Sequence, residues 1–160
     1  MQRVNNMVRR TDREIKDKEE MEAIIQQAQV CHVGLSEKDE PYVVPMDFGY
    51  KDNCLYFHCA KEGKKLDIIR KNNNVCFEVD IDHQMTKPEN KPCGWDAKYR
   101  CVIGFGKAYF IEDFKEKAKA LNVLIQHYGA DSYEIADEIL NKVGIIKIEI
   151  SSMTGKKAGY

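Results

Sequence analysis

Strand-like segments that follow one another through short turns dominate this chain and restrict the folds open to it. Six segments are rich in β-branched and aromatic residues. They are Val30–Leu35, Pro41–Tyr50, Leu55–Ala60, Val75–Ile81, Tyr99–Phe110 and Ile145–Ile150. The turn Lys51–Asn53 suits a hairpin, and strands do not alternate regularly with helices. This order predicts a mainly β fold and favours an antiparallel barrel over a doubly wound parallel sheet.

Helices are expected at the periphery of this sheet. Asp17 and Asp113 each precede a glutamate by three residues, a pattern typical of a helix N-terminus. Gly129 suits a helix C-cap. The expected helices cover residues 17–28, 64–72, 113–127 and 132–141. Residues 1–16 are predicted to form an N-terminal arm and residues 17–160 a single domain.

Several residues should interrupt the strands. Pro45 cannot donate a ladder hydrogen bond, so its strand should be irregular or lie at a sheet edge. Gly104 and Gly106 suggest a bulge, or a close approach by backbone or ligand. Residues 82–96, which include the only tryptophan, Trp95, are expected to form a long loop.

The charge balance and the apolar runs limit the classes of function. There are 25 Lys and Arg against 26 Asp and Glu, and the net charge of -1 argues against a general nucleic-acid binder. No apolar run approaches the roughly 20 residues that span a bilayer. Met1–Arg13 lacks the apolar stretch of a signal peptide. We therefore expect a cytoplasmic protein that binds neither membranes nor nucleic acid.

The spacing of the six cysteines does not suggest a metal site. Several lie within apolar strand segments, where free cysteine is often a buried, reduced core residue. A zinc site normally shows paired Cys or His ligands at short spacing. Cys54, His58 and Cys59 lie close together but lack a second pair. We expect mostly reduced core thiols and no metal.

The segment Lys61-Glu62-Gly63-Lys64-Lys65 is the candidate ligand site. It lies between a strand and a predicted helix, where backbone N–H groups at the helix start favour an anion. Gly63 permits a close backbone approach, and Lys64 and Lys65 add positive charge. The Walker A pattern is absent. Taken alone, the segment fits a phosphate site and a solvated basic turn equally well.

Five segments carry a wider resemblance that covers nearly the whole chain after residue 8. They are Pro41–Tyr50, Leu55–Asp67, Val75–Asp80, Lys98–Gly106 and Ile148–Lys156. In this order they resemble the pyridoxamine 5′-phosphate oxidase-like FMN-binding split-barrel superfamily. Within it, the chain is most similar to the nitroimidazole-resistance-type proteins.

This resemblance implies an antiparallel six-stranded split β-barrel, a homodimer, and one FMN in each of two clefts at the subunit interface. The implied cofactor contacts fall into four groups. They are Gly63, Lys64 and Lys65 at the phosphate; His58, Cys59 and Ala60 at the adjoining strand end; Val44, Pro45, Met46 and Asp47 along the isoalloxazine ring; and Trp95, Tyr99 and Arg100 from the other subunit.

The leading functional hypothesis is an FMN-dependent oxidoreductase that reduces small electron-poor molecules such as nitroaromatic compounds. The sequence shows no unmistakable catalytic acid or base, so a flavin carrier, sensor or store without turnover is the alternative. His58 is the candidate catalytic residue, and it also fits a packed histidine at a strand end. A third alternative, a haem-handling protein, would need an axial ligand such as His58 or His127. The pyridoxamine-phosphate oxidases themselves have an arginine before the lysine of the phosphate loop, where this chain has Lys64. We therefore do not expect this protein to oxidise pyridoxamine phosphate.

Overall fold

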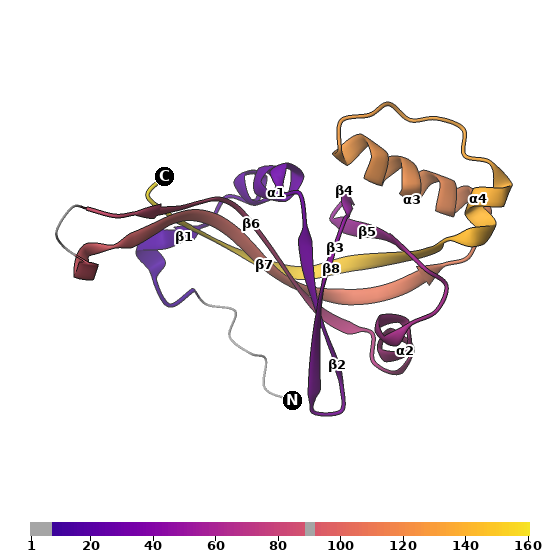
Figure 1. Ribbon diagram of the computed structural model, residues 1–160, viewed down its shortest axis with the longest axis horizontal. Helices are drawn as coiled ribbons and strands as arrows, with labels where there is room; N and C mark the ends of the chain where they lie inside the picture. Colours follow the sequence, from indigo (N-terminus) through magenta and orange to yellow (C-terminus); the bar gives the residue numbers. More distant parts are fainter. Residues whose placement is uncertain (1–7, 89–91) are drawn as a thin grey trace.

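Eight strands form one antiparallel sheet in the computed structural model, which describes residues 8–88 and 92–160 (Figure 1). They are β1 (Glu14–Ile15), β2 (Cys31–Glu37), β3 (Glu40–Met46), β4 (Gly49–Lys51), β5 (Cys54–Cys59), β6 (Asn74–Thr86), β7 (Asp96–Ile111) and β8 (Gly144–Ala158). The strand order is β3-β2-β6-β7-β8-β5-β4, and β1 pairs with β8. The predicted fold class is confirmed, with eight strands in place of the six expected.

The two additional strands arise where the chain leaves or joins the ladder. The predicted strand 41–50 divides into β3 and β4, because the intervening Phe48 turns into the core and its side chain is completely buried. The N–H of Phe48 donates to the hydroxyl of Tyr128 (3.1 Å) instead of to a neighbouring strand. Within the predicted arm, Glu14 and Ile15 pair with β8, and Ile15 enters the core. Residues 1–7 of that arm lie outside the described residues.

The connection between β3 and β4 shows how strongly the sheet curls. These strands lie at opposite ends of the strand order, with five strands between them, although only Asp47 and Phe48 separate them in sequence. A flat sheet would hold them apart by several inter-strand spacings of about 4.8 Å. The sheet must therefore curl until its two edges approach, which is the split-barrel geometry. Pro45 lies in the edge strand β3, as predicted.

The hairpin of β6 and β7 is longer than the sequence suggested. The predicted loop 82–96 is wrong over much of its length, because the ladder continues to the pair Thr86 and Asp96. A register shift between Ile81 and Gln84, with Asp82 at φ 58°, accommodates the irregular sequence without ending the strand. A second register shift occurs between Phe105 and Gly106, as the glycines predicted. Residues 89–91 of the predicted loop lie outside the described part of the chain.

Four α-helices surround the sheet (Figure 1), as far as residues 8–88 and 92–160 show. They are α1 (Lys18–Gln27), α2 (Lys64–Lys71), α3 (Phe114–His127) and α4 (Asp137–Lys142). Two short 3₁₀ turns are η1 (Thr11–Arg13) and η2 (Pro92–Gly94). The predicted N-caps are confirmed, since Asp17 accepts from the N–H of Glu19 and Asp113 from that of Glu116 (both 3.0 Å). Within the described residues, no helix is both long and apolar enough to cross a membrane.

The last predicted helix, 132–141, begins later than expected. The backbone of Tyr133 is bonded to the side chain of Asn122 on α3, so this stretch cannot form helical hydrogen bonds of its own. Gly129 ends the preceding helix with φ +85°, in agreement with its predicted role.

Candidate functional site

The curl of the sheet brings the junction of β3 and β4 beside the end of β5. Gly49 pairs with Tyr56 at the start of the β4–β5 ladder. Asp47 precedes Gly49 by two residues, and His58 follows Tyr56 by two residues. Asp47 and His58 line the same cavity, whose volume is about 470 Å³. One residue from each of two predicted groups, Asp47 of residues 44–47 and His58 of residues 58–60, thus lines the same cavity although β3 and β5 are not paired.

A second contact joins the start of α2 to β3. The Nζ of Lys64 donates to Glu40 Oε1 (3.2 Å) and lies 5.0 Å from the centre of the Tyr42 ring. Both partners belong to β3. The pair is exposed, so it adds little to stability. It does show that the start of α2 lies against the beginning of β3.

Gly63 and Lys65 have the features of an anion site at the start of α2. Gly63 has φ +132°, and a Cβ atom built on it would meet nothing within 4 Å, so the backbone is open to a ligand. Lys65 is half-buried and has no ion-pair or hydrogen-bond partner among the residues that the structure describes. The first N–H groups of a helix also lack partners within the helix. A partly desolvated cation beside an open helix start favours an anionic ligand.

Cys59 offers this site its backbone but not its thiol. The side chain is buried, and the thiol donates to the carbonyl oxygen of Gly144 (3.6 Å). Burial raises the pKa of Cys59, although the nearby Lys65 opposes the shift. All six cysteines are free; Cys31 is also buried, whereas Cys93 is exposed. We assign Cys59 a structural role on this basis.

Trp95, Tyr99 and Arg100 lie on the β6–β7 hairpin, and this chain does not bring them to its own α2. Figure 1 shows the far end of the hairpin and α2 at opposite ends of the molecule. Arg100 is paired with Asp82, and its guanidinium lies 5.3 Å from the centre of the Tyr160 ring. These side chains could reach an α2 site only on a second copy of the chain.

His58 and His127 differ in whether their imidazole rings have hydrogen-bond partners. His58 is exposed at the end of β5 and has no hydrogen-bond partner within the described residues. The Nε2 of His127, by contrast, lies 2.8 Å from the carbonyl oxygen of Ala28, and its ring centre lies 4.4 Å from that of Phe48. His127 is therefore held by a hydrogen bond and by packing, whereas His58, at the cavity, has no hydrogen-bond partner in the part of the chain that the structure describes.

The far wall of the cavity contains residues that the sequence did not indicate as functional. They come from α3, the segment after it and α4. They are Leu121, Leu124, Ile125, Tyr128, Ala130, Tyr133, Ile135, Ile139 and Val143. Leu121, Leu124 and Ile125 were expected only as the apolar side of a helix. No local signal shows that such a face borders a cavity.

A separate polar cluster lies on β2 and β6. Potential ligand atoms of His32, Glu78 and Asp80 all lie within 4.8 Å of one another. His32 Nδ1 is 3.2 Å from Glu78 Oε2, so these two groups already satisfy each other. Burial is the main cause that raises the pKa of Glu78, with Asp80 adding to it and His32 opposing it.

The raised pKa of Glu78 predicts a pH-dependent effect of Glu78→Gln. The folded state holds the proton of Glu78 more tightly than the unfolded state, so ionisation costs stability as pH rises through the folded pKa. The variant should therefore be more stable than the wild type at pH 8, by less than about 1 kcal/mol because the group is partly exposed. The gain should vanish below the ordinary pKa of glutamate. Urea unfolding at both pH values measures this, and a gain that persists at low pH would contradict it.

Comparison with known proteins agrees with this architecture. The family model described as pyridoxamine 5′-phosphate oxidase matches residues 17–157. The chain belongs to this family. No curated protein matches it.

Solved structures extend the comparison. A proposed 5-nitroimidazole antibiotic resistance protein from Bacteroides thetaiotaomicron is 37% identical, with 89% of this chain and 85% of that chain covered and a TM-score of 0.80. An FAD and heme binding protein from Mycobacterium smegmatis is 16% identical, with 92% and 74% covered and a TM-score of 0.81. A flavocytochrome from Azotobacter vinelandii is 18% identical, with 96% and 73% covered and a TM-score of 0.80. The last two share the fold.

Proposed function

We propose that this protein binds FMN and acts in the cytoplasm as a flavin-dependent reductase of small electron-poor compounds. The observation that carries the proposal is the half-buried Lys65, which lacks an ion-pair partner among the described residues and lies beside the open backbone of Gly63. A phosphate monoester fits this cation and the adjoining helix start. Membership of the pyridoxamine 5′-phosphate oxidase family supports the same reading.

The protein's own residues would bind and orient the cofactor. Lys64 and Lys65 would hold the phosphate, and the backbone of residues 44–47 would run along the ring. When bound, FMN supplies the capacity to accept and donate a hydride or single electrons. His58, at the cavity beside Asp47, would contact the ring or the compound to be reduced. It is the candidate proton donor, since its imidazole has no partner in the described part of the chain.

A homodimer belongs to this proposal. The exposed apolar side chains Val43, Ile103, Phe105 and Tyr109 on β3 and β7 offer a surface for a second copy. The partner's hairpin would bring Trp95, Tyr99 and Arg100 to the cofactor, which a single chain does not achieve. Arg100 would have to exchange part of its pairing with Asp82 to do so.

The binding claim predicts a yellow protein. Purified full-length chain, mixed with FMN and passed through a desalting column, should keep the flavin absorbance. Mass spectrometry of the released ligand, with FAD offered in competition, identifies the flavin. Protein that stays colourless after this treatment contradicts the proposal. Tight binding without turnover of NADH or NADPH and a nitro compound would instead support a flavin carrier or sensor.

A further inference from the structure

The cavity beside His58 is lined mostly by apolar and aromatic side chains. We propose that it binds the uncharged aromatic ring of the molecule to be reduced, and that Asn122 is a positioning residue that holds its outer wall. This inference rests on the proposed function, because it assumes that a flavin lies next to His58 and Asp47.

The size and lining of the cavity select the class of ligand. Its volume of about 470 Å³ lies within the range of small-molecule sites, roughly 300–1,000 Å³. Among its described lining residues, Asp47 is the sole carboxylate, and there is no lysine or arginine. An anionic ligand would meet the charge of Asp47, and the described lining offers no lysine or arginine to offset it. The tyrosines at positions 128 and 133 present electron-rich rings, which favour an aromatic, electron-poor partner.

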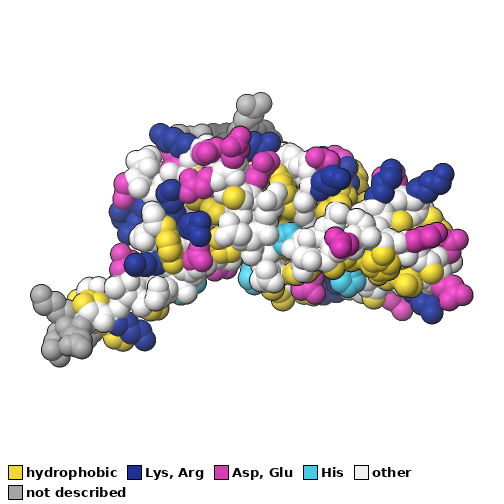
Figure 2. All heavy atoms as spheres, turned by 90° about the horizontal axis from the view of Figure 1, so that it is seen from above, with side chains coloured by type: hydrophobic (Ala, Val, Ile, Leu, Met, Phe, Trp, Pro, Cys, Tyr) yellow, Lys and Arg dark blue, Asp and Glu magenta, His cyan; other side chains and the backbone are white. Residues whose placement is uncertain are grey.

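The outer wall of the cavity is the segment between α3 and α4. Figure 2, seen from above, shows hydrophobic side chains gathered over this end of the molecule. Tyr133 and Ile139 are 56% and 46% exposed, although both line the cavity. Residues 129–136 contain no helix or strand, so the buried Ile135 and side-chain hydrogen bonds to α3 anchor them.

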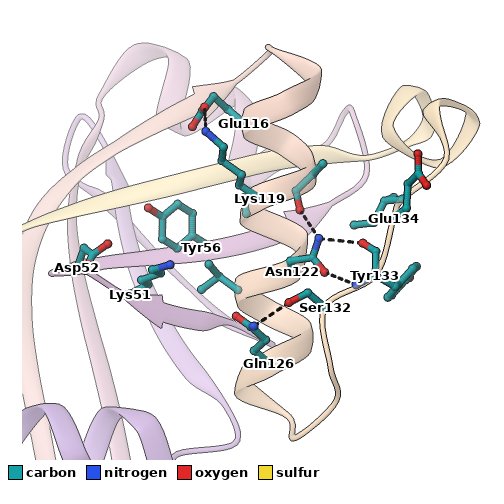
Figure 3. Close-up of a pocket in the computed structure, with 14 residues that line it drawn as sticks. Lys51, Asp52, Tyr56, Glu116, Lys119, Asn122, Gln126, Ser132, Tyr133 and Glu134 are labelled. Carbon is teal, nitrogen blue, oxygen red and sulfur yellow. Dashed lines mark hydrogen bonds and ion pairs between the residues drawn. The ribbon is translucent and has the colours of Figure 1, made fainter.

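Asn122 supplies the main attachment of this segment. Its Oδ1 accepts from the N–H of Tyr133 (2.9 Å), and its Nδ2 donates to the carbonyl oxygens of Tyr133 and Ala118 (both 3.1 Å). Figure 3 shows this clamp, together with a second, single hydrogen bond in which Gln126 donates to the Ser132 hydroxyl (2.8 Å). The amide thus bonds both polar groups of one residue's backbone to the helix.

The clamped residue also separates two cavities. Tyr133 and Ile135 line both the apolar cavity and a neighbouring one of about 590 Å³, which is drawn in Figure 3. The neighbour has Lys51, Glu116 and Lys119 in its lining and is therefore unsuited to an apolar ring. The position of Tyr133 consequently determines how much space remains beside His58.

The test measures ligand and cofactor affinities separately on the full-length protein. FMN affinity is determined first. With FMN bound, saturation-transfer NMR then measures p-nitrobenzyl alcohol and its anionic analogue p-nitrobenzoate. We expect the neutral compound to bind at least about tenfold more tightly. Ile139→Asp should weaken it by about tenfold or more, because a charge enters the apolar wall. Val30→Asp, the same change at a comparably exposed apolar residue outside the cavity, should not.

Asn122→Ala tests the positioning role. We expect a loss of affinity for p-nitrobenzyl alcohol of about fivefold or more with FMN affinity nearly unchanged, and a melting temperature lowered by only a few degrees because the bonds to Tyr133 are exposed. A purely structural role would lower the melting temperature and both affinities together, which would overturn the assignment of Asn122. Competition between p-nitrobenzyl alcohol and FMN would show that the cavity holds the flavin ring, against the proposal. Equal effects of Ile139→Asp and Val30→Asp would exclude this cavity as the binding site of the aromatic compound. Failure of the proposed function is distinct, because FMN itself would then not bind.

Discussion

Replacing Lys64 and Lys65 together by alanine is expected to weaken FMN binding by at least about 1.5 kcal/mol, which is more than tenfold in Kd. The two ammonium groups flank the open start of α2, where an anion gains from both the charge and the helix N–H groups. Alanine is a strong helix former, so α2 should remain folded. Isothermal titration or quenching of flavin fluorescence measures the loss.

The two lysines should not contribute equally. Lys64 already pairs with Glu40 and must give up part of this interaction to hold a phosphate, whereas Lys65 has no such partner in the described chain. Lys65→Ala alone should therefore cause the larger part of the loss. The control is the pair Lys16→Ala and Lys18→Ala, which removes the same total charge near α1. If the α2 double variant binds FMN as tightly as this control, the phosphate assignment is wrong.

Gly106→Ala is the second substitution with a large expected effect, a loss of about 3 kcal/mol in the free energy of unfolding. A Cβ at this position would overlap the carbonyl oxygen of Glu149 and lie 3.0 Å from Cγ2 of Ile148. The obstacle is backbone of the neighbouring strand β8, which cannot rotate away as a side chain could. The melting temperature should fall by about 6–12 °C, on the usual scale for a chain of this length.

Gly34→Ala is the matched control for this prediction. Gly34 also lies within a strand, but an added Cβ would make ordinary contacts with Cys76, at 3.5 Å and 3.7 Å. Alanine there should be neutral or slightly stabilising, because glycine is a poor strand residue. Equal melting temperatures for the two variants would contradict the prediction, because they would show that the backbone around Gly106 can move to make room for the added Cβ.

Features of this fold that depend on neighbouring residues could be predicted from the sequence, whereas features that depend on distant elements could not. The helix starts at Asp17 and Asp113 were predicted correctly, because a cap acts over two or three residues. The glycine bulge in β7 and the edge position of Pro45 were also predictable from single-residue chemistry. The extent of the β6–β7 hairpin was not, because strands lengthen when a partner continues alongside them, whatever the local composition.

The segment 132–136 illustrates the same limit. The composition of this segment allows a helix. Instead, the N–H and carbonyl groups of Tyr133 are bonded to the side chain of Asn122, eleven residues away. When the competing side chain belongs to another element, as Asn122 does, the sequence of the segment itself carries no sign of the competition. The cavity wall that results could be found only in the folded structure.

The sequence by itself determined the six main strand segments, the helix N-caps, the family and the basic segment Lys61–Lys65, all of which depend on residues near each other or on their order along the chain. The tertiary structure decided which of these residues meet. The curl of the sheet joins β3 to the start of α2 and places Asp47 beside His58, because two residues must bridge opposite edges of the strand order. It also decided that Lys64 is paired, whereas Lys65 has no ion-pair partner among the described residues, since the position of Glu40 relative to α2 follows from that closure.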